Sequence, residues 1–178
     1  MAHLISIDPG ISSGIAVFRY TATQPAQLVH SDQFRGGVEE LTHRITQLKK
    51  EYRNATYICE DFQARPQTGF SYTTASLEPL ACIGALTALH IINRKDRNQM
   101  VTPAMQYFSG GTGKQERKKR QHEWLKESGL YVTGKQFGTP DADDARSAIA
   151  HGIAWLRKHH KPTARRYFPP QQETPASV

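Results

Sequence analysis

Two short apolar runs that each end in an acid constrain the fold of this chain more than any other feature. Residues 3–8 read HLISID and residues 55–60 read ATYICE, so each has the length and composition of a buried strand and ends at Asp8 or Glu60. The ends of such strands are where an α/β sheet presents functional groups. If the two strands are parallel neighbours, Asp8 and Glu60 share one pocket.

The remaining segments predict an α/β domain with a five-stranded mixed sheet flanked by helices. Two further alternating runs follow the first strand and complete an antiparallel meander. Apolar residues at steps of three and four predict an amphipathic helix at 38–52, and the almost wholly apolar segment 76–92 predicts a core helix or a dimer helix. The expected strands are 3–8, 14–20, 27–34, 55–60 and 99–102, and the expected helices are 38–52, 76–92, a brief one after residue 102, 114–128 and 141–159.

At 178 residues the chain fits one domain, expected over residues 1–159, followed by a basic tail rich in Pro and Gln at 160–178 that we expect to be flexible. No apolar run is long enough to span a bilayer, and the first residues lack the features of a signal peptide, so a cytoplasmic protein without a membrane partner is expected. Cys59 and Cys82 lie in apolar segments without metal-ligand spacing and are interpreted as buried thiols.

A third group of acids opens the last predicted helix, at Asp141, Asp143 and Asp144. On a helix, residues 141 and 144 share a face, so both carboxylates could point into the pocket of Asp8 and Glu60. Clustered carboxylates repel one another unless a cation neutralises them, and hard oxygen ligands favour Mg²⁺ or Mn²⁺. Acids at a helix start also cap the helix and complement its dipole, and Asp143 is the candidate for that role.

Five segments resemble the RuvC family of Holliday-junction resolvases, which are RNase H-like nucleases. They are ISIDPGISSGIAVF at 5–18, YICEDF at 57–62, the helix through ACIGALTALHI, VTPAMQYFSGGTGKQERKKRQ at 101–121 and DADDARSAIAHGIAWL at 141–156, in family order. The resemblance implies an RNase H-like fold with catalytic and metal-binding acids at Asp8, Glu60, Asp141 and Asp144. It also implies a homodimer that cuts four-way junctions. The divergence is more typical of a phage-encoded member acting in an infected host than of a bacterial housekeeping one.

The activity predicted on this basis is phosphodiester hydrolysis with two Mg²⁺ ions per site, for which Mn²⁺ may substitute, and with no small-molecule cofactor. Asp8 would serve both ions, Glu60 would complete one site, and Asp141 with Asp144 would complete the other. His151, seven residues after Asp144, is interpreted as structural because histidines on helix flanks usually are.

A net charge of +7 indicates a polyanionic partner, expected to be branched DNA. The run KQERKKR after the glycine-rich SGGTG could neutralise several phosphates, although a solvated helix face explains such a run as well. Family members carry an aromatic wedge after the second acid; Phe62 stands one place early, so Phe70 or Tyr72 could take that role. The predicted DNA-binding residues are Lys114, Arg117, Lys118, Lys119, Arg120, Phe62, Phe70 and Tyr72.

The sequence also bears on several other functions. A phosphate-binding P-loop is rejected at GGTGK, because Phe108 replaces its first glycine and Gln115 its Ser or Thr. The actin and sugar-kinase superfamily shares the first turn but needs a second domain, for which the chain is too short. An RNase H-like nuclease for other branched DNA or for structured RNA, and a branched-DNA-binding module that does not cut, both stay open.

Overall fold

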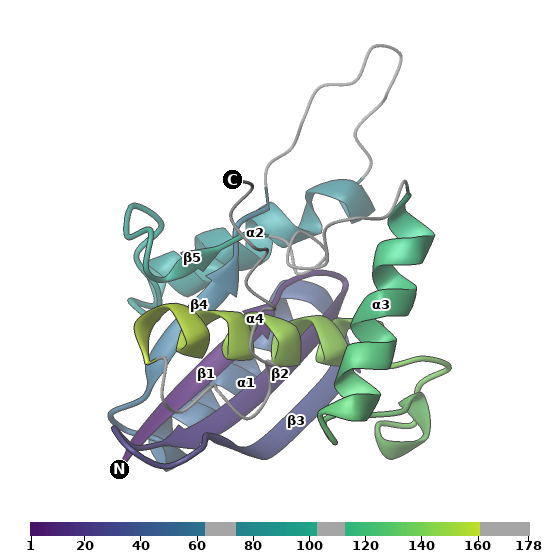
Figure 1. Ribbon diagram of the computed structural model, residues 1–178. Coiled ribbons are helices and arrows are strands. Elements are labelled where there is room, and N and C mark those ends of the chain that lie inside the picture. The colour runs from purple at the N-terminus through teal and green to yellow at the C-terminus, as the bar shows by residue number, and fades with distance from the viewer. Residues whose placement is uncertain (63–73, 103–112, 161–178) are drawn as a thin grey trace, which may run out of the picture.

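The computed structural model is described for residues 1–62, 74–102 and 113–160, without the side chains of residues 74–76 and 114. Its centre is a five-stranded mixed sheet in the order β3-β2-β1-β4-β5 (Figure 1). The β1–β2 and β2–β3 pairs are antiparallel, whereas β4 pairs in parallel with β1 and with β5. The strands are β1 (Ala2–Asp8), β2 (Ser12–Tyr20), β3 (Gln27–Arg35), β4 (Thr56–Glu60) and β5 (Met100–Val101).

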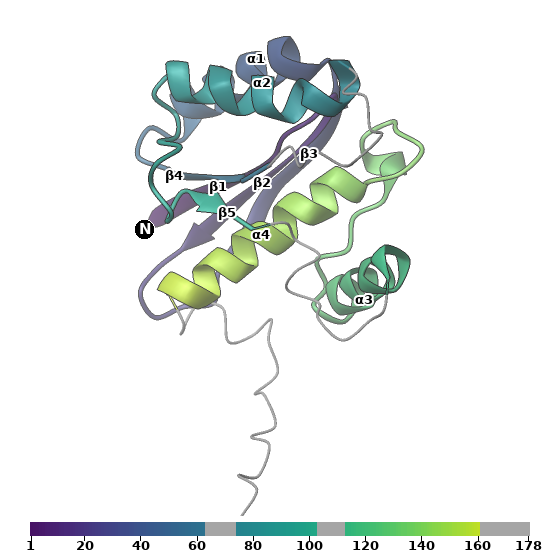
Figure 2. The same ribbon diagram turned by 90° about the horizontal axis from the view of Figure 1, so that it is seen from above.

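Helices cover both faces of this sheet (Figure 2). Helices α1 (Gly37–Glu51) and α2 (Thr74–Ala88) lie on one face, and α4 (Asp143–His159) lies across the other face with α3 (Lys114–Glu127) beside it. A short 3-10 helix, Gly134–Gln136, lies between α3 and α4. The predicted α/β class, the meander and the mixed sheet are therefore confirmed.

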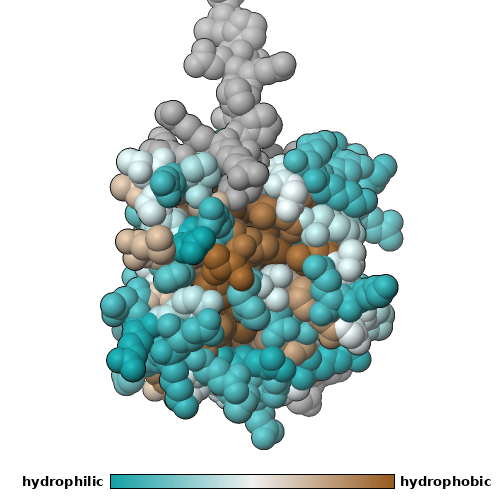
Figure 3. Space-filling model, turned by 90° about the horizontal axis from the view of Figure 1, so that it is seen from below, coloured by the Kyte–Doolittle hydropathy of each residue, from teal (hydrophilic) through white to brown (hydrophobic). Residues whose placement is uncertain are grey.

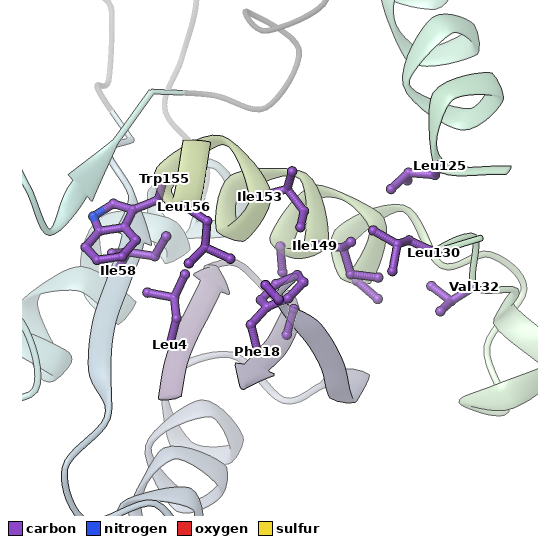
Figure 4. Packing of buried hydrophobic residues seen from close by; sticks show 14 of the residues in the cluster. Leu4, Phe18, Ile58, Leu125, Leu130, Val132, Ile149, Ile153, Trp155 and Leu156 are labelled. Carbon is purple, nitrogen blue, oxygen red and sulfur yellow. The ribbon is translucent and has the colours of Figure 1, made fainter. Parts of the chain in front are cut away.

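Two hydrophobic cores follow from this layering. Strand β1 contributes Leu4 to the core under α4 and Ile5 and Ile7 to the core under α1 and α2, so its apolar run is continuous because both faces are covered. In the first core, Phe18 of β2 packs against Ile149 of α4 (Figure 4). Both cysteines are buried and free, as predicted.

Helix α2 ends four residues earlier than the sequence predicts. The apolar run to residue 92 reads as one helix, but α2 stops at Ala88 and His90 has a positive φ of 53°. The backbone N–H groups of Ile91 and Ile92 then donate to the carbonyl of Leu86, so a turn rather than a helix buries these isoleucines. The brief helix, the 63–73 loop and the tail beyond residue 160 lie outside the described residues.

The face of the molecule seen from below is mostly hydrophilic, with a hydrophobic area near its centre (Figure 3). Among the described helices, none combines the length and the apolar character needed to cross a membrane. Within the described ranges, the exposed large hydrophobic side chains are Met1, Ile11, Val29, Leu77 and Leu89.

Candidate metal centre

Asp8 and Glu60 meet at the carboxyl edge of the sheet. Strands β1 and β4 are parallel neighbours, with Ile7 opposite Cys59, so the next residue of each strand is an acid at the same level. Ligand atoms of Asp8, Glu60 and His151 all lie within 4.8 Å of one another. The predicted meeting of the two acids is confirmed, and their role as metal ligands stays a prediction.

His151 is the third member of this cluster, which sequence reasoning left out. It comes from the middle of α4, its side chain has no exposed surface, and its Nε2 lies 2.7 Å from Oε2 of Glu60. The available signal was its spacing, because seven residues are two helical turns and place His151 on the same face as Asp144. The sequence does not show which surface this side of the helix faces, so the spacing alone could not identify His151 as a member of the cluster.

The start of α4 packs against a row of three neighbouring residues on strands β1, β2 and β3. Asp8 is opposite Gly14 of β2, and Gly14 is opposite Gln33 of β3. A Cβ atom at position 14 would overlap the backbone carbonyl of Asp144, so only glycine lets the first turn of α4 lie on β2. This close approach brings Asp144 toward Asp8.

Gln33 fastens that turn. Its side-chain Oε1 accepts hydrogen bonds from the backbone N–H groups of Asp144 (2.9 Å) and Ala145 (3.1 Å), and its Nε2 donates to the carbonyl oxygen of Asp141 (2.8 Å). The first N–H groups of a helix lack partners within the helix, so this buried glutamine acts as a cap supplied by a distant strand. Sequence reasoning missed Gln33, because nothing near α4 in the sequence points to it.

Negative charge accumulates around Asp8. Burial raises the pKa of Asp8 well above its usual value, and the neighbouring charges of Glu60 and Asp144 raise it further, while a hydrogen bond with Ser147 acts in the opposite direction. Burial also raises the pKa of Asp144, against a hydrogen bond with Ser12. Asp144 therefore acts electrostatically on Asp8, although its ligand atoms are not within the 4.8 Å cluster.

The other two acids occupy places that the sequence did not predict. Helix α4 begins at Asp143, so Asp141 precedes it, and the expectation of one helical face shared by Asp141 and Asp144 is wrong. The Asp141 carboxylate accepts a hydrogen bond from the backbone N–H of Asp143 at 3.1 Å. The capping contact assigned to Asp143 is therefore made by Asp141, since the Gln33 clamp fixes where the helix starts.

Asp143 instead joins α3 to α4. Its carboxylate forms ion pairs with Lys118 of α3 and Arg146 of α4, and His122 Nε2 lies 3.4 Å away. Burial raises the pKa of Asp143, but the hydrogen bonds from Lys118 and Arg146 outweigh this and hold it below its usual value. Asp143 is thus ionised and paired with Lys118 and Arg146, and it is not a member of the Asp8, Glu60 and His151 cluster.

The structure describes the side chains of five of the eight residues that are predicted to contact DNA. Arg117, Lys118, Lys119 and Arg120 lie on α3, and Phe62 is half-buried against the core under α1 and α2. The side chain of Lys114, and both Phe70 and Tyr72, lie outside the described residues. Their contact with DNA stays a prediction.

The sheet order, the pattern of parallel and antiparallel pairs and the helices on both faces are those of the RNase H-like fold. No family model matches the sequence, and no curated protein matches it.

Solved structures of Thermus thermophilus RuvC match the fold. One, described as RuvC in complex with Holliday junction substrate, superposes with a TM-score of 0.54 at 15% identity and covers 89% of this chain and 96% of its own. Another, described as the Thermus thermophilus RuvC structure, gives a TM-score of 0.53 at 17% identity, covering 88% and 96%. This chain therefore shares the RuvC-type fold over most of its length, although its sequence is very different.

Proposed function

We propose that this protein is a metal-dependent DNA endonuclease that resolves four-way junctions by paired nicks. The observation that carries the proposal is the cluster of Asp8, Glu60 and His151 at the carboxyl edge of an RNase H-like sheet, with the charge of Asp144 close by. The superposed Thermus RuvC, which is described with a Holliday junction substrate, supports the choice of DNA structure.

The residues present fit a divalent cation. Asp8 is partly accessible, as a ligand must be, yet it stands among carboxylates that raise its pKa, and a cation would offset that repulsion. Carboxylate oxygens favour Mg²⁺, with Mn²⁺ as a substitute, and the imidazole of His151 adds a softer donor that Mn²⁺ tolerates. Asp144 is the proposed ligand for a second ion, and Asp141, which precedes α4 and accepts a hydrogen bond from Asp143, is the remaining candidate for it.

The side chains of the chain itself have separate tasks in this proposal. Divalent cations held by these residues would supply a water of lowered pKa and would offset charge on the phosphate. Asp8 would hold the central position. His151 would either ligate an ion or, through the 2.7 Å contact of its Nε2, fix one oxygen of Glu60 and leave the other oxygen for an ion. Gln33 and Gly14 hold the first turn of α4, and with it Asp144, against the edge of the sheet.

The test is cleavage of a synthetic four-way junction by purified protein with Mg²⁺. The wild type should introduce paired nicks, and Asp8→Asn should bind the junction without cutting it. Glu51→Gln, which removes an exposed carboxylate on α1, serves as the matched control and should cut normally. A wild type that binds every branched substrate and cuts none would leave the branched-DNA-binding module as the function, and preferential cutting of structured RNA would change the substrate.

His151 can be tested in the same assay. His151→Ala should reduce cutting and weaken Mn²⁺ binding measured by calorimetry, because it removes a contact to Glu60 and a candidate donor. Unchanged Mn²⁺ affinity with reduced cutting would make His151 a positioning residue rather than a ligand.

A homodimer is proposed to form through α2. Helix α2 packs on α1, while Ala81, Gly84 and Ala88 are exposed at steps of three and four, with exposed Leu77 one turn earlier. Small side chains allow close approach of a second helix. Light scattering at micromolar concentration should therefore report a dimer, and a monomer would contradict this proposal.

A further inference from the structure

A second charged region lies beyond the metal centre. The second half of α4, β5 and the chain joining α2 to β5 enclose a cleft of about 770 Å³. In Figures 1 and 2 this is the side of the molecule where β5 lies near the end of α4. The cationic side chains that line the cleft are Arg94, Lys95, Arg97 and Lys158, and His159 lies beside them.

Positive charge exceeds negative charge in this cleft. Within residues 1–62, 74–102 and 113–160, no salt bridge involves Arg94, Lys95, Arg97 or Lys158, and all four are exposed. Among the described residues lining the cleft, Asp61 is the one carboxylate. Four long cations around one hollow leave an excess of positive charge that an anion would complement.

The wall that carries these cations is anchored to α4. The indole Nε1 of Trp155 donates a hydrogen bond to the carbonyl oxygen of Asn98 at 2.7 Å, and its ring stacks on His159 with centroids 4.5 Å apart. Within the connecting chain, the Asp96 carboxylate accepts a hydrogen bond from the N–H of Asn98 at 2.8 Å. The cations therefore project from backbone that is held in place, which lowers the cost of ordering them around a ligand.

Two elements that carry residues of the metal centre also contribute residues to the cleft. On α4, His151, Ala154 and Lys158 follow one another at steps of three and four, so one face of the helix leads from Glu60 into the cleft. Lys158 is about 10 Å farther along the helix than His151, at 1.5 Å per residue. Asp61, which lines the cleft, directly follows Glu60. A chain molecule whose phosphate is at Asp8 and Glu60 would extend over these cations.

We infer that this cleft binds the sugar–phosphate backbone of the nucleic-acid strand that is cut, on one side of the scissile phosphate. The identification of the polyanion rests on the proposed function. The placement of the contact rests on the unpaired cations and on their alignment with the carboxylates. A strand suits the cleft better than a small anion does, because the cations come from two separate segments, residues 94–97 and the end of α4.

The test compares two sets of three charge-removing substitutions in the Asp8→Asn background, so that binding is measured without cutting. The cleft set is Arg94→Gln, Arg97→Gln and Lys158→Gln. The control set is Lys49→Gln, Lys50→Gln and Arg53→Gln, which removes three exposed cations around the end of α1, on the opposite face of the sheet. Binding of a labelled four-way junction is measured against salt concentration.

The cleft set should bind at least tenfold more weakly at low salt, and its slope of log affinity against log salt should fall by about 2, since each lost phosphate contact contributes roughly 0.7–0.9. The control set should change the slope by less than half as much. Arg97→Lys alone keeps the charge and should keep the affinity. Circular dichroism confirms that each variant is folded.

Equal slopes for the cleft and control sets would overturn the inference, whether or not the wild type cuts DNA. Inorganic phosphate that competes at millimolar concentration as well as an oligonucleotide does would also overturn it, in favour of a small-anion site. Failure of the wild type to cut, with the cleft effect intact, would contradict the proposed function alone.

Discussion

Two basic regions flank the carboxylates along α4, and they differ in how their charge is used. On α3, Lys118 is paired with Asp143, Lys119 lies 3.9 Å from Glu123, and Arg120 lies 3.2 Å from Glu116. In the cleft at the other end of α4, no arginine or lysine has a salt-bridge partner within the described part of the chain. The cations that are consecutive in the sequence, on α3, are therefore largely paired with acids. The cations that are scattered in the sequence, in the cleft, are more available to DNA.

The α3 region is also built into the fold. Arg146, whose side chain is only 6% exposed, pairs with Asp143 and donates to the hydroxyl of Tyr131 at 3.0 Å and the carbonyl of Val132 at 3.1 Å. Through Asp143, Lys118 of α3 is tied to the first turn of α4. We expect changes on α3 to affect stability, and changes in the cleft to affect binding.

The largest stability effect is expected for Asp143→Asn. It leaves the buried guanidinium of Arg146 without its charged partner, which should lower the free energy of unfolding by about 2–3 kcal/mol in urea denaturation. Glu116→Gln, which breaks an exposed pair on α3, is the matched control.

The same variant tests the assignment of the acids. Asp143→Asn should still cut a junction at low temperature, whereas Asp144→Asn should not. Loss of cutting in the first variant alone would reverse the roles of these two residues.

Trp155→Phe should have an intermediate effect on the free energy of unfolding. This variant distinguishes the contribution of charge to DNA binding from the contribution of an ordered cleft wall. It removes the hydrogen bond to Asn98 but no charge, so the free energy of unfolding should fall by about 1–2 kcal/mol. DNA affinity should fall only modestly, roughly two- to fivefold, with an unchanged salt slope. A reduced slope would mean that Trp155 decides whether the cations reach the phosphates at all.

The smallest effect is expected for Lys119→Gln. Its side chain is 76% exposed and its partner Glu123 is 55% exposed, so breaking this pair should change the free energy of unfolding by less than about 0.5 kcal/mol. A larger change in thermal or urea unfolding would show that the α3 pairs act as a network, and would sharpen the contrast with the cleft.

The sequence by itself determined the strands that end at Asp8 and Glu60, their meeting, and the amphipathic helix α1. These features have local causes, because strand length, alternation and helical spacing are properties of a few consecutive residues. It also identified the resemblance to RuvC, with which the superposed structures agree in fold.

Only the tertiary structure decided how the centre is completed and where free charge lies. Gln33 clamps a helix more than 100 residues away, His151 contacts Glu60 across 91 positions, and Trp155 fastens Asn98 across 57. Such contacts depend on which surfaces the packed sheet and helices bring together, and no local pattern carries that information. For the same reason, the predicted start of α4 was wrong, and the ion pair of Lys118 with Asp143 was not predicted. The need for glycine at position 14 is explained only by the backbone of Asp144, which packs against it in the folded structure.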